Sequence, residues 1–595
     1  MNRFTEAIWL TTRGLVKAVS RFPLTVFCLG AATILVCYMI SLHKDPGLLL
    51  QKLMFTSLLG AFMGVAAQFS CERWQRLMQM RVAVYIGAAL LILGYYLILL
   101  PVPGINYAVR ARTLVAVFAM FCAFIWVPSF RGKADFNSIA LTHFKTAFTA
   151  ILYAAVLSAG CSSIIAAIDV LLFRVNTDSY AYTMGVIWIF FANLYYLSLL
   201  PHFNSEEEVD QAYARHAASC PRSLEVLISY IAVPLVAAYS LVLLAYFIKI
   251  LVTLKWPSGQ LGPMILGYSA AGLLVFILAS RLENRFATLY RLVFPKALIL
   301  MVVMQLISVA IRLNAYGITE SRYYVALFGV FSLVCGILLS FKPVGKNSVI
   351  ALIAAGLAIF SVLPPLDAFT VSRSSQVARL EKMLQAEGVL ADGKIVPRAD
   401  VSMELRLETT SILNYLELRN YLQYLQWLPP GFKTHEQMKG TFGFDTAYEA
   451  MPGDARHFDA FFDFQKPLDI SGYDVMINMN SYTRLEGPET PPVDFQVRNV
   501  KYKLSVERLS PQEVKVTVAD QAGAELVSTG LYDFANSLTG VGNTPKQALE
   551  PVNLDVSKNG YRMRIVLQSV NITFGTGTDA GANYSFFVLF GAPSR

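Results

Sequence analysis

Hydrophobic residues are distributed differently on the two sides of Pro364-Pro365. Before this point, long apolar runs alternate with short polar segments, and a helix needs about 20 mostly apolar residues to cross a bilayer. The runs therefore predict eleven transmembrane helices. Their approximate bounds are 22–42, 53–70, 82–101, 113–130, 146–168, 181–201, 224–251, 263–280, 294–312, 322–341 and 348–364.

After the last apolar run the periodicity changes. The segment SQVARLEKMLQAEGVL places Val377, Leu380 and Leu384 at helical spacing, and SILNYLELRNYLQYLQWL repeats this pattern. From about residue 456, segments such as EVKVTVAD and NYSFFVLFG alternate apolar and polar positions or collect β-branched and aromatic residues, which is typical of strands. We expect this half to end in a β-sandwich or an open sheet.

These patterns divide the chain into four predicted parts. They are an amphipathic N-terminal arm (1–21), a transmembrane bundle (22–366), a helical connector (367–455) and a β-rich domain (456–595). The predicted fold class is an α-helical polytopic membrane bundle of about 11 helices, followed by an extracytoplasmic α+β domain whose C-terminal part resembles a β-sandwich.

The basic residues predict the orientation of the bundle. Residues 1–366 hold 27 Lys+Arg against 13 Asp+Glu, although only 15% of the whole chain is charged and 55% is hydrophobic. With the N-terminus in the cytoplasm, the predicted cytoplasmic segments hold 18 Lys+Arg and the outer segments hold 9, which follows the positive-inside rule. We expect a multi-pass protein of the bacterial cytoplasmic (inner) membrane, with residues 367–595 in the periplasm or outside. The basic surplus belongs to the membrane half, so no nucleic-acid partner is expected.

The chain contains little that points to catalysis or metal binding. It has no G-x-S-x-G elbow, no phosphate-binding P-loop and no G-x-G-x-x-G fingerprint. The six histidines are scattered, and none is spaced from a carboxylate or a cysteine as metal ligands are. All seven cysteines precede residue 366, and none forms a CxxC pair. The sequence favours a protein that uses no cofactor or metal and that is not an enzyme.

The segment RLNAYGITESRYY (312–324) is the main candidate site. It joins the ninth and tenth predicted spans at the outer face, and charges beside a membrane are functional candidates because they are costly to bury. Arg312 and Arg322 with one carboxylate can form a cationic notch that holds an anionic headgroup, such as a phosphate. The alternative is a charge-neutral turn pinned by interfacial aromatics. The five candidate residues are Arg312, Tyr316, Glu320, Arg322 and Tyr323.

Three further residues are secondary candidates. Lys249 lies near the outer end of the seventh span, where a lysine can also snorkel to the interface. Lys255 belongs to the turn KWPSG (255–259), which the predicted topology places on the same face as the notch. Asp169 ends the fifth span, where an ion pair or an interfacial position is the alternative. The mid-span Asn193 is better explained by helix packing.

Several of these segments resemble a known family. The stretches 234–262, 312–330 and 367–396 are similar to the bacterial membrane family catalogued as domain of unknown function 4153, and the resemblance covers about 50–480. The most specific part is the turn Y-G-I-T-E-x-R-Y-Y, matched by Tyr316, Gly317, Ile318, Thr319, Glu320, Arg322, Tyr323 and Tyr324. The resemblance implies a multi-spanning envelope protein with an extracytoplasmic C-terminal region. It implies no activity and no catalytic residues.

Three functions fit these observations. The first is a non-enzymatic envelope protein whose β-rich domain binds a protein partner or a surface polymer. The second is a transporter or lipid-handling protein that contacts membrane lipids and holds an anionic headgroup in the notch, although no inverted repeat supports transport. The third is a glycosyltransferase for a lipid-linked sugar. The short first outer loop HKDPGLLLQK, whose only acid is Asp45, argues against the third function.

Overall fold

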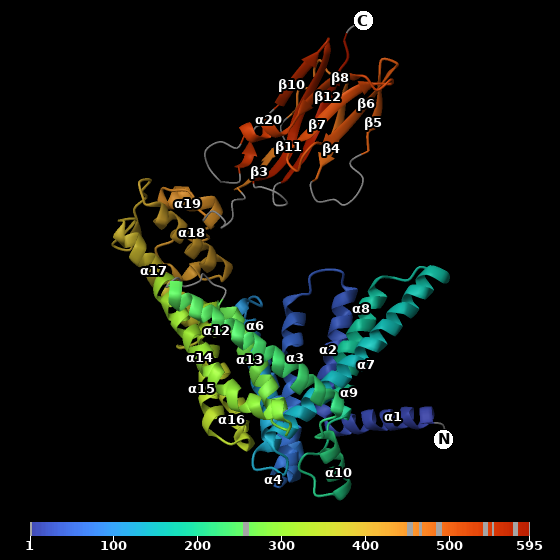
Figure 1. Cartoon of the computed structure of the whole chain (residues 1–595), viewed down its shortest axis with the longest axis vertical. Coiled ribbons are helices and arrows are strands. Elements are labelled where there is room, and N and C mark those ends of the chain that lie inside the picture. Colours follow the sequence, from blue (N-terminus) through green and yellow to red (C-terminus); the bar gives the residue numbers. More distant parts are fainter. Residues whose placement is uncertain are drawn as a thin grey trace. The chain divides into compact units, whose positions relative to one another are not determined.

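The computed structural model describes residues 3–253, 261–448, 456–462, 467–482, 491–538, 546–549, 553–574 and 581–593. The chain forms two compact units, Met1–Thr446 and Ala447–Arg595. The first unit is helical and carries the membrane-spanning segments, whereas the second is built from β-sheets (Figure 1). The helices predicted for the connector thus fall in the same unit as the bundle.

Among the described residues, ten helical stretches are long and apolar enough to cross a membrane. Together they make this chain an integral membrane protein with a helical bundle, as the sequence predicts. The ten are α2 (Pro23–Ser41), α3 (Leu48–Arg73), α5 (Arg81–Leu99), α6 (Tyr107–Ser129), α7 (Phe136–Leu171), Asp178–Ser198, Glu208–Thr253, α13 (Leu261–Ala279), α14 (Arg285–Tyr316) and α15 (Glu320–Phe341).

Three further helices lie in the same unit. The last predicted span, 348–364, forms α16 (Ser348–Phe360), which has 13 residues. At 1.5 Å per residue α16 is about 20 Å long, shorter than the hydrocarbon core of about 30 Å. At the other end of the chain, α1 (Arg3–Arg21) runs crosswise to α2 and α3 in Figure 1, and α4 (Gln75–Gln79) follows α3.

Two of the ten stretches contain a π-helical segment. The segments are Val186–Phe191 and Leu227–Ala232. The first joins α8 (Asp178–Gly185) to α9 (Ala192–Ser198), and the second joins α11 (Arg222–Val226) to α12 (Val233–Thr253), while α10 (Glu208–Ala217) precedes α11. Such segments interrupt the regular hydrogen-bond ladder and are frequent at functional sites.

Some helices begin well before their apolar runs. The fifth span was predicted from residue 146, but α7 begins at Phe136, where the Asp135 side chain caps the helix by accepting a hydrogen bond from Ser138 N. The ninth was predicted from 294, but α14 begins at Arg285, and Asn284 caps it in the same way. Capping side chains extend these helices through polar first turns that a hydropathy window does not count.

Small residues bring α2 and α3 into close contact. A Cβ atom built on Gly60 would lie 2.7 Å from Cys28 Sγ, and one built on Gly64 would lie 2.8 Å from Thr25 N. Only glycine permits this approach, as expected for a GxxxG motif in a membrane helix.

The last helices of the first unit form a small helical subdomain, which we call the cap. It comprises α17 (Ala368–Ala386), α18 (Met403–Leu418) and α19 (Thr434–Phe442), together with the hairpin of β1 (Leu390–Ala391) and β2 (Lys394–Ile395). Its core is apolar and fully buried at Leu380, Leu384, Leu413, Leu416 and Phe442. The helical spacing of Leu380 and Leu384 therefore predicted the buried face correctly.

The described residues of the second unit form two sheets. In the first sheet the strand order is β4-β12-β11-β3-β9, and β10 also pairs with β11; in the second the order is β5-β6-β7-β8. Every pairing is antiparallel except β3 with β9. The strands are β3 (Arg456–Phe462), β4 (Val475–Ser481), β5 (Val493–Val497), β6 (Val500–Arg508), β7 (Val514–Asp520), β8 (Glu525–Gly530), β9 (Lys546–Leu549), β10 (Asn553–Lys558), β11 (Tyr561–Phe574) and β12 (Gly581–Gly591); α20 (Tyr532–Ser537) follows β8.

The two sheets share one hydrophobic core. Leu504 and Val516 from the four-stranded sheet and Ile565 and Phe586 from the other are fully buried in the same cluster. Along β7, and along β12 as far as Val588, buried positions alternate with partly buried ones, which is the period of two that the sequence displays. This arrangement is the β-sandwich-like part of the predicted fold class.

Candidate functional site

The turn between α14 and α15 is held by α17. Gly317, with φ of +69°, ends α14, and glycine adopts this conformation readily. Ile318 N donates a hydrogen bond to Ser375 Oγ at 2.9 Å. Gln376 Nε2 donates to the carbonyl oxygens of Tyr316 and Ile318, each at 3.0 Å. The central part of the candidate segment is therefore fixed by the cap.

Glu320 faces the cap. Its side chain is fully buried and accepts hydrogen bonds from the hydroxyls of Tyr415 at 2.5 Å and Tyr421 at 3.0 Å. Arg419 Nε lies 3.6 Å from the same carboxylate. Burial, together with the negative charge of Glu320, raises the pKa of both phenols above the ordinary value. The predicted carboxylate of the notch instead joins α15 to α18.

The two arginines of the candidate segment line one pocket of about 300 Å³, which we call the arginine pocket. Arg312 comes from the end of α14 and Arg322 from the first turn of α15. Both arginines belong to its lining, and none of the described residues that line it is acidic. The other lining residues are Gly262, Pro263, Ser308, Val309, Thr319, Ser321 and Val325.

The two arginines are held differently. Arg322 Nη1 donates to the carbonyl oxygens of Tyr316 at 3.0 Å and Gly317 at 2.9 Å, and its guanidinium lies 5.5 Å from the centre of the Tyr316 ring. Arg312 makes no hydrogen bond or ion pair with any residue that the structure describes. Arg322 is thus oriented by the turn, while Arg312 keeps its donors available for a ligand.

The remaining predicted residues do not line the arginine pocket. The Tyr323 hydroxyl donates a hydrogen bond to the Leu366 carbonyl oxygen at 2.8 Å. It therefore contacts the segment that connects the bundle to the cap. Asp169 accepts a hydrogen bond from Val175 N at 2.7 Å, which closes the turn after α7. Lys249 is exposed on α12. Lys255 lies outside the described residues.

An apolar crevice begins one helical turn further along α13 and α15. Its volume is about 370 Å³, and Leu266 on α13 and Phe328 on α15 are among its walls. Those two residues follow Gly262 and Val325 of the arginine pocket by four and three positions, so they lie on the same helix faces. The other lining residues are Leu114, Val115, Phe118, Tyr324, Leu327, Phe331, Ala354, Leu357, Ala358 and Ser361.

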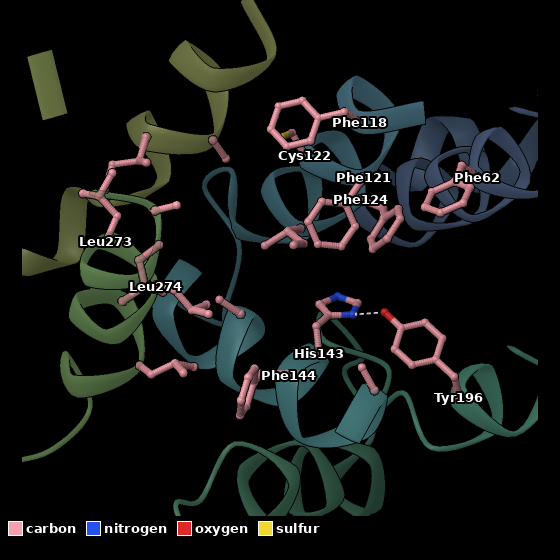
Figure 2. Close-up of a pocket in the computed structure, with 18 of the residues that line it drawn as sticks. Phe62, Phe118, Phe121, Cys122, Phe124, His143, Phe144, Tyr196, Leu273 and Leu274 are labelled. Atoms are coloured by element: carbon pink, nitrogen blue, oxygen red, sulfur yellow. Dashed lines mark hydrogen bonds between the residues drawn. The ribbon is translucent and has the colours of Figure 1, made fainter. Parts of the chain in front are cut away.

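A larger cavity of about 680 Å³ lies within the bundle, and the sequence did not indicate it (Figure 2). Its walls are mainly aromatic, and His143 faces Tyr196 across a hydrogen bond of 2.6 Å. Because the fifth span was predicted from residue 146, His143 was assigned to a cytoplasmic segment. The early start of α7 places it two turns inside the helix, and the capping residue Asp135 was the available signal.

Among the described residues, no group of three or more His, Cys, Asp or Glu side chains comes together to hold a metal ion. The mid-span Asn193 bonds within its own helix, where its Nδ2 donates to the carbonyls of Trp188 at 3.0 Å and Ile189 at 2.9 Å.

Comparison with known proteins gives one match. The family described as Domain of unknown function (DUF4153) matches residues 30–395, which begins and ends earlier than the predicted 50–480. No curated protein matches the chain, and no solved structure does. The matched range contains the arginine pocket and the larger cavity, and it leaves out the β-sandwich.

Proposed function

The chain belongs to the family described as Domain of unknown function (DUF4153), and from this premise we propose that it is a lipid-handling protein that binds an anionic lipid headgroup in the arginine pocket. The observation that carries the proposal is that Arg312 and Arg322 line one pocket with no acid among its described lining residues. Like charges that share a pocket repel each other, and an anion between them removes that repulsion.

The other groups of the pocket suit a phosphate. Guanidinium groups bind phosphate oxygens through paired N–H donors. The hydroxyls of Ser308, Thr319 and Ser321 supply three more donors at the same place. Thr319 is also the N-cap of α15, and the N-terminus of a helix favours a negative charge.

A lipid suits the surroundings better than a free anion. The arginine pocket lies where α14 ends and α15 begins, and both helices are long and apolar enough to cross a membrane. The apolar crevice follows one turn further along α13 and α15 and can hold part of an acyl chain, because its walls are almost entirely apolar.

The cellular setting belongs to the same proposal. The excess of Lys and Arg in the predicted cytoplasmic segments supports the bacterial cytoplasmic membrane, an N-terminus in the cytoplasm and a periplasmic β-sandwich. This orientation needs an odd number of crossings, so α16 has to cross together with its flanking residues. Partner binding by the β-sandwich and turnover of a lipid-linked sugar stay predictions from the sequence.

The test is lipid binding by the purified full-length protein, measured by native mass spectrometry. We expect phosphatidylglycerol to bind and phosphatidylcholine to bind at least tenfold more weakly. Arg312→Gln should weaken phosphatidylglycerol binding about 10- to 100-fold, since a charge-assisted hydrogen bond contributes about 1.5–3 kcal/mol. Arg312 has no partner among the described residues, so this change leaves the fold intact.

The matched control is Arg174→Gln, which removes an exposed arginine that follows α7 and has no partner among the described residues. It should leave binding unchanged. Equal binding by wild type and Arg312→Gln would overturn the proposal. Inorganic phosphate is the third probe: if it competes fully with the lipid at equal concentration, the pocket binds a free anion and not a lipid.

A further inference from the structure

The larger cavity is a second site with a different chemistry. Phe121, Phe124 and Phe136 are among its aromatic walls, and Trp188 adds an indole from the π-helical segment Val186–Phe191. Figure 2 shows the His143 ring between the phenylalanines of α6 and Tyr196. We call it the aromatic cavity. None of its described lining residues is Asp, Glu, Lys or Arg, so a charged ligand would lose its hydration there without gaining a counter-charge.

One buried polar atom of the cavity lining has no hydrogen-bond partner among the described residues. His143 is 4% exposed, and its Nε2 is buried with no hydrogen bond to a described residue. Its Nδ1 lies 2.6 Å from the Tyr196 hydroxyl. Buried polar atoms without a hydrogen-bond partner are rare in native proteins, so each one needs an explanation.

The hydrogen bond to Tyr196 decides which nitrogen of His143 carries the proton. If the Tyr196 hydroxyl donates to Nδ1, then Nε2 carries the hydrogen and a single donor is left unpaired. If Nδ1 donates instead, both the hydroxyl hydrogen of Tyr196 and the lone pair of Nε2 are left unpaired. The first arrangement leaves fewer unsatisfied groups, so we assign the unpaired donor to Nε2 of His143, whose side chain is part of the cavity lining.

We infer that the aromatic cavity binds a neutral apolar molecule that carries a carbonyl oxygen, which accepts a hydrogen bond from His143 Nε2. The apolar walls bury its hydrocarbon part, and the single donor orients its oxygen. A volume of about 680 Å³ lies within the range of ligand pockets. Two classes of membrane molecule have this chemistry, namely fatty acyl esters and isoprenoid quinones.

The aromatic cavity adjoins the apolar crevice. Phe118, Phe328 and Phe331 line both the aromatic cavity and the apolar crevice, so the two hollows are neighbours. The inference does not rest on the arginine pocket, because the ligand it names is uncharged and no lining residue is shared with that pocket.

The test compares the binding of three probes to the full-length protein in nanodiscs. Empty nanodiscs give the reference for partition of each probe into the lipid. The probes are a benzoquinone with a ten-carbon tail, methyl decanoate and decane. We expect at least one carbonyl probe to bind tenfold or more tightly than decane. Preference for the quinone or for the ester identifies the source of the natural ligand.

Two variants test the donor. His143→Phe should reduce binding of the preferred carbonyl probe about tenfold and leave decane unaffected, whereas His143→Gln, which keeps an N–H donor, should retain most of the affinity. The exposed control Arg174→Gln should change neither. Equal affinity of wild type for decane and both carbonyl probes would overturn the inference, as would unchanged carbonyl binding in His143→Phe. If His143→Phe fails to fold, the comparison of the three probes on the wild-type protein still tests the inference.

Discussion

The hydroxyl of Tyr415 donates a hydrogen bond to the carboxylate of Glu320 across 2.5 Å, although 95 residues separate them in the chain. Tyr421 donates to the other carboxylate oxygen, and Arg419 lies within 3.6 Å. These contacts join the start of α15 to the cap. They also remove the only acid of the 312–324 segment from the arginine pocket, so the cationic character of that pocket depends on where Glu320 points.

Replacing Glu320 should loosen the cap. Glu320→Gln loses a charged acceptor for two buried phenols, which costs about 1–3 kcal/mol. We expect amide hydrogen exchange in α18 and α19 to become about 5- to 150-fold faster, as measured by mass spectrometry. Tyr424→Phe is the control, because no side-chain hydrogen bond of Tyr424 lies among the described residues. Unchanged exchange in Glu320→Gln would show that the Tyr415 bond does not hold the cap.

A second prediction concerns the buried ion pair between α1 and α3. Arg21 Nε and Nη2 donate to the two carboxylate oxygens of Glu72 at 2.7 Å and 2.8 Å, and the two side chains are only 10% and 7% exposed. Arg21→Gln removes the bidentate charge partner of a buried carboxylate, which keeps only its contacts with Gln68 at 2.8 Å and His202 at 3.5 Å, and this costs up to about 3–5 kcal/mol. Thermal unfolding in detergent should show a clear loss of stability.

Two further variants make this prediction specific. Arg21→Gln combined with Glu72→Gln should recover part of the loss, because no isolated charge remains. Lys17→Gln, at an exposed position of α1, should leave the unfolding temperature unchanged. A double variant that is less stable than Arg21→Gln alone would contradict the ion-pair explanation.

The β-sandwich should respond to acid through Glu525. Hydrogen bonds from Lys515 and Ser528 lower the pKa of this carboxyl from its ordinary 4.5 to about 2. The folded state therefore keeps Glu525 ionised where the unfolded chain binds a proton. The stability it contributes is fully present above pH 4.5 and is lost as the pH falls toward 2.

Glu525→Gln should make the stability of this unit less dependent on pH between 4.5 and 2, as followed by near-ultraviolet circular dichroism of the full-length protein. The control is Glu507→Gln, which changes an exposed carboxylate of β6 that has no ion pair among the described residues. If both variants keep the wild-type acid profile, Glu525 does not contribute to it.

The proposed orientation can be tested with cysteine labelling. Residues 367–595 contain no cysteine, so Ala522→Cys places a unique thiol in the exposed turn between β7 and β8. A membrane-impermeant maleimide should label it in intact cells. The natural Cys220, between α10 and α11, should react only after permeabilisation. Labelling of Cys220 but not of residue 522 in intact cells would show that the orientation is opposite to the proposed one. Labelling of both would imply an even number of membrane crossings.

The elements that depend on local pattern can be read from the order of the amino acids alone. Hydrophobic runs of membrane length gave the bundle, and the change to a period of two near residue 456 gave the β-sandwich, because burial imposes these patterns on each element separately. The sequence also identified Arg312 and Arg322 as a pair at neighbouring helix ends. A short connection between α14 and α15 brings such residues together whatever the rest of the fold does.

Which side chains share a site depends on how the whole chain packs. The sequence pattern groups Glu320 with the arginines because it lies between them in the chain, but its partners are tyrosines 95 and 101 residues away. His143 lies in the cavity wall because the capping residue Asp135 starts α7 early and because Tyr196, on another helix, forms a hydrogen bond with it. Hydrogen bonds between distant segments leave no periodic signal, so only the packed chain fixes the direction of each polar side chain.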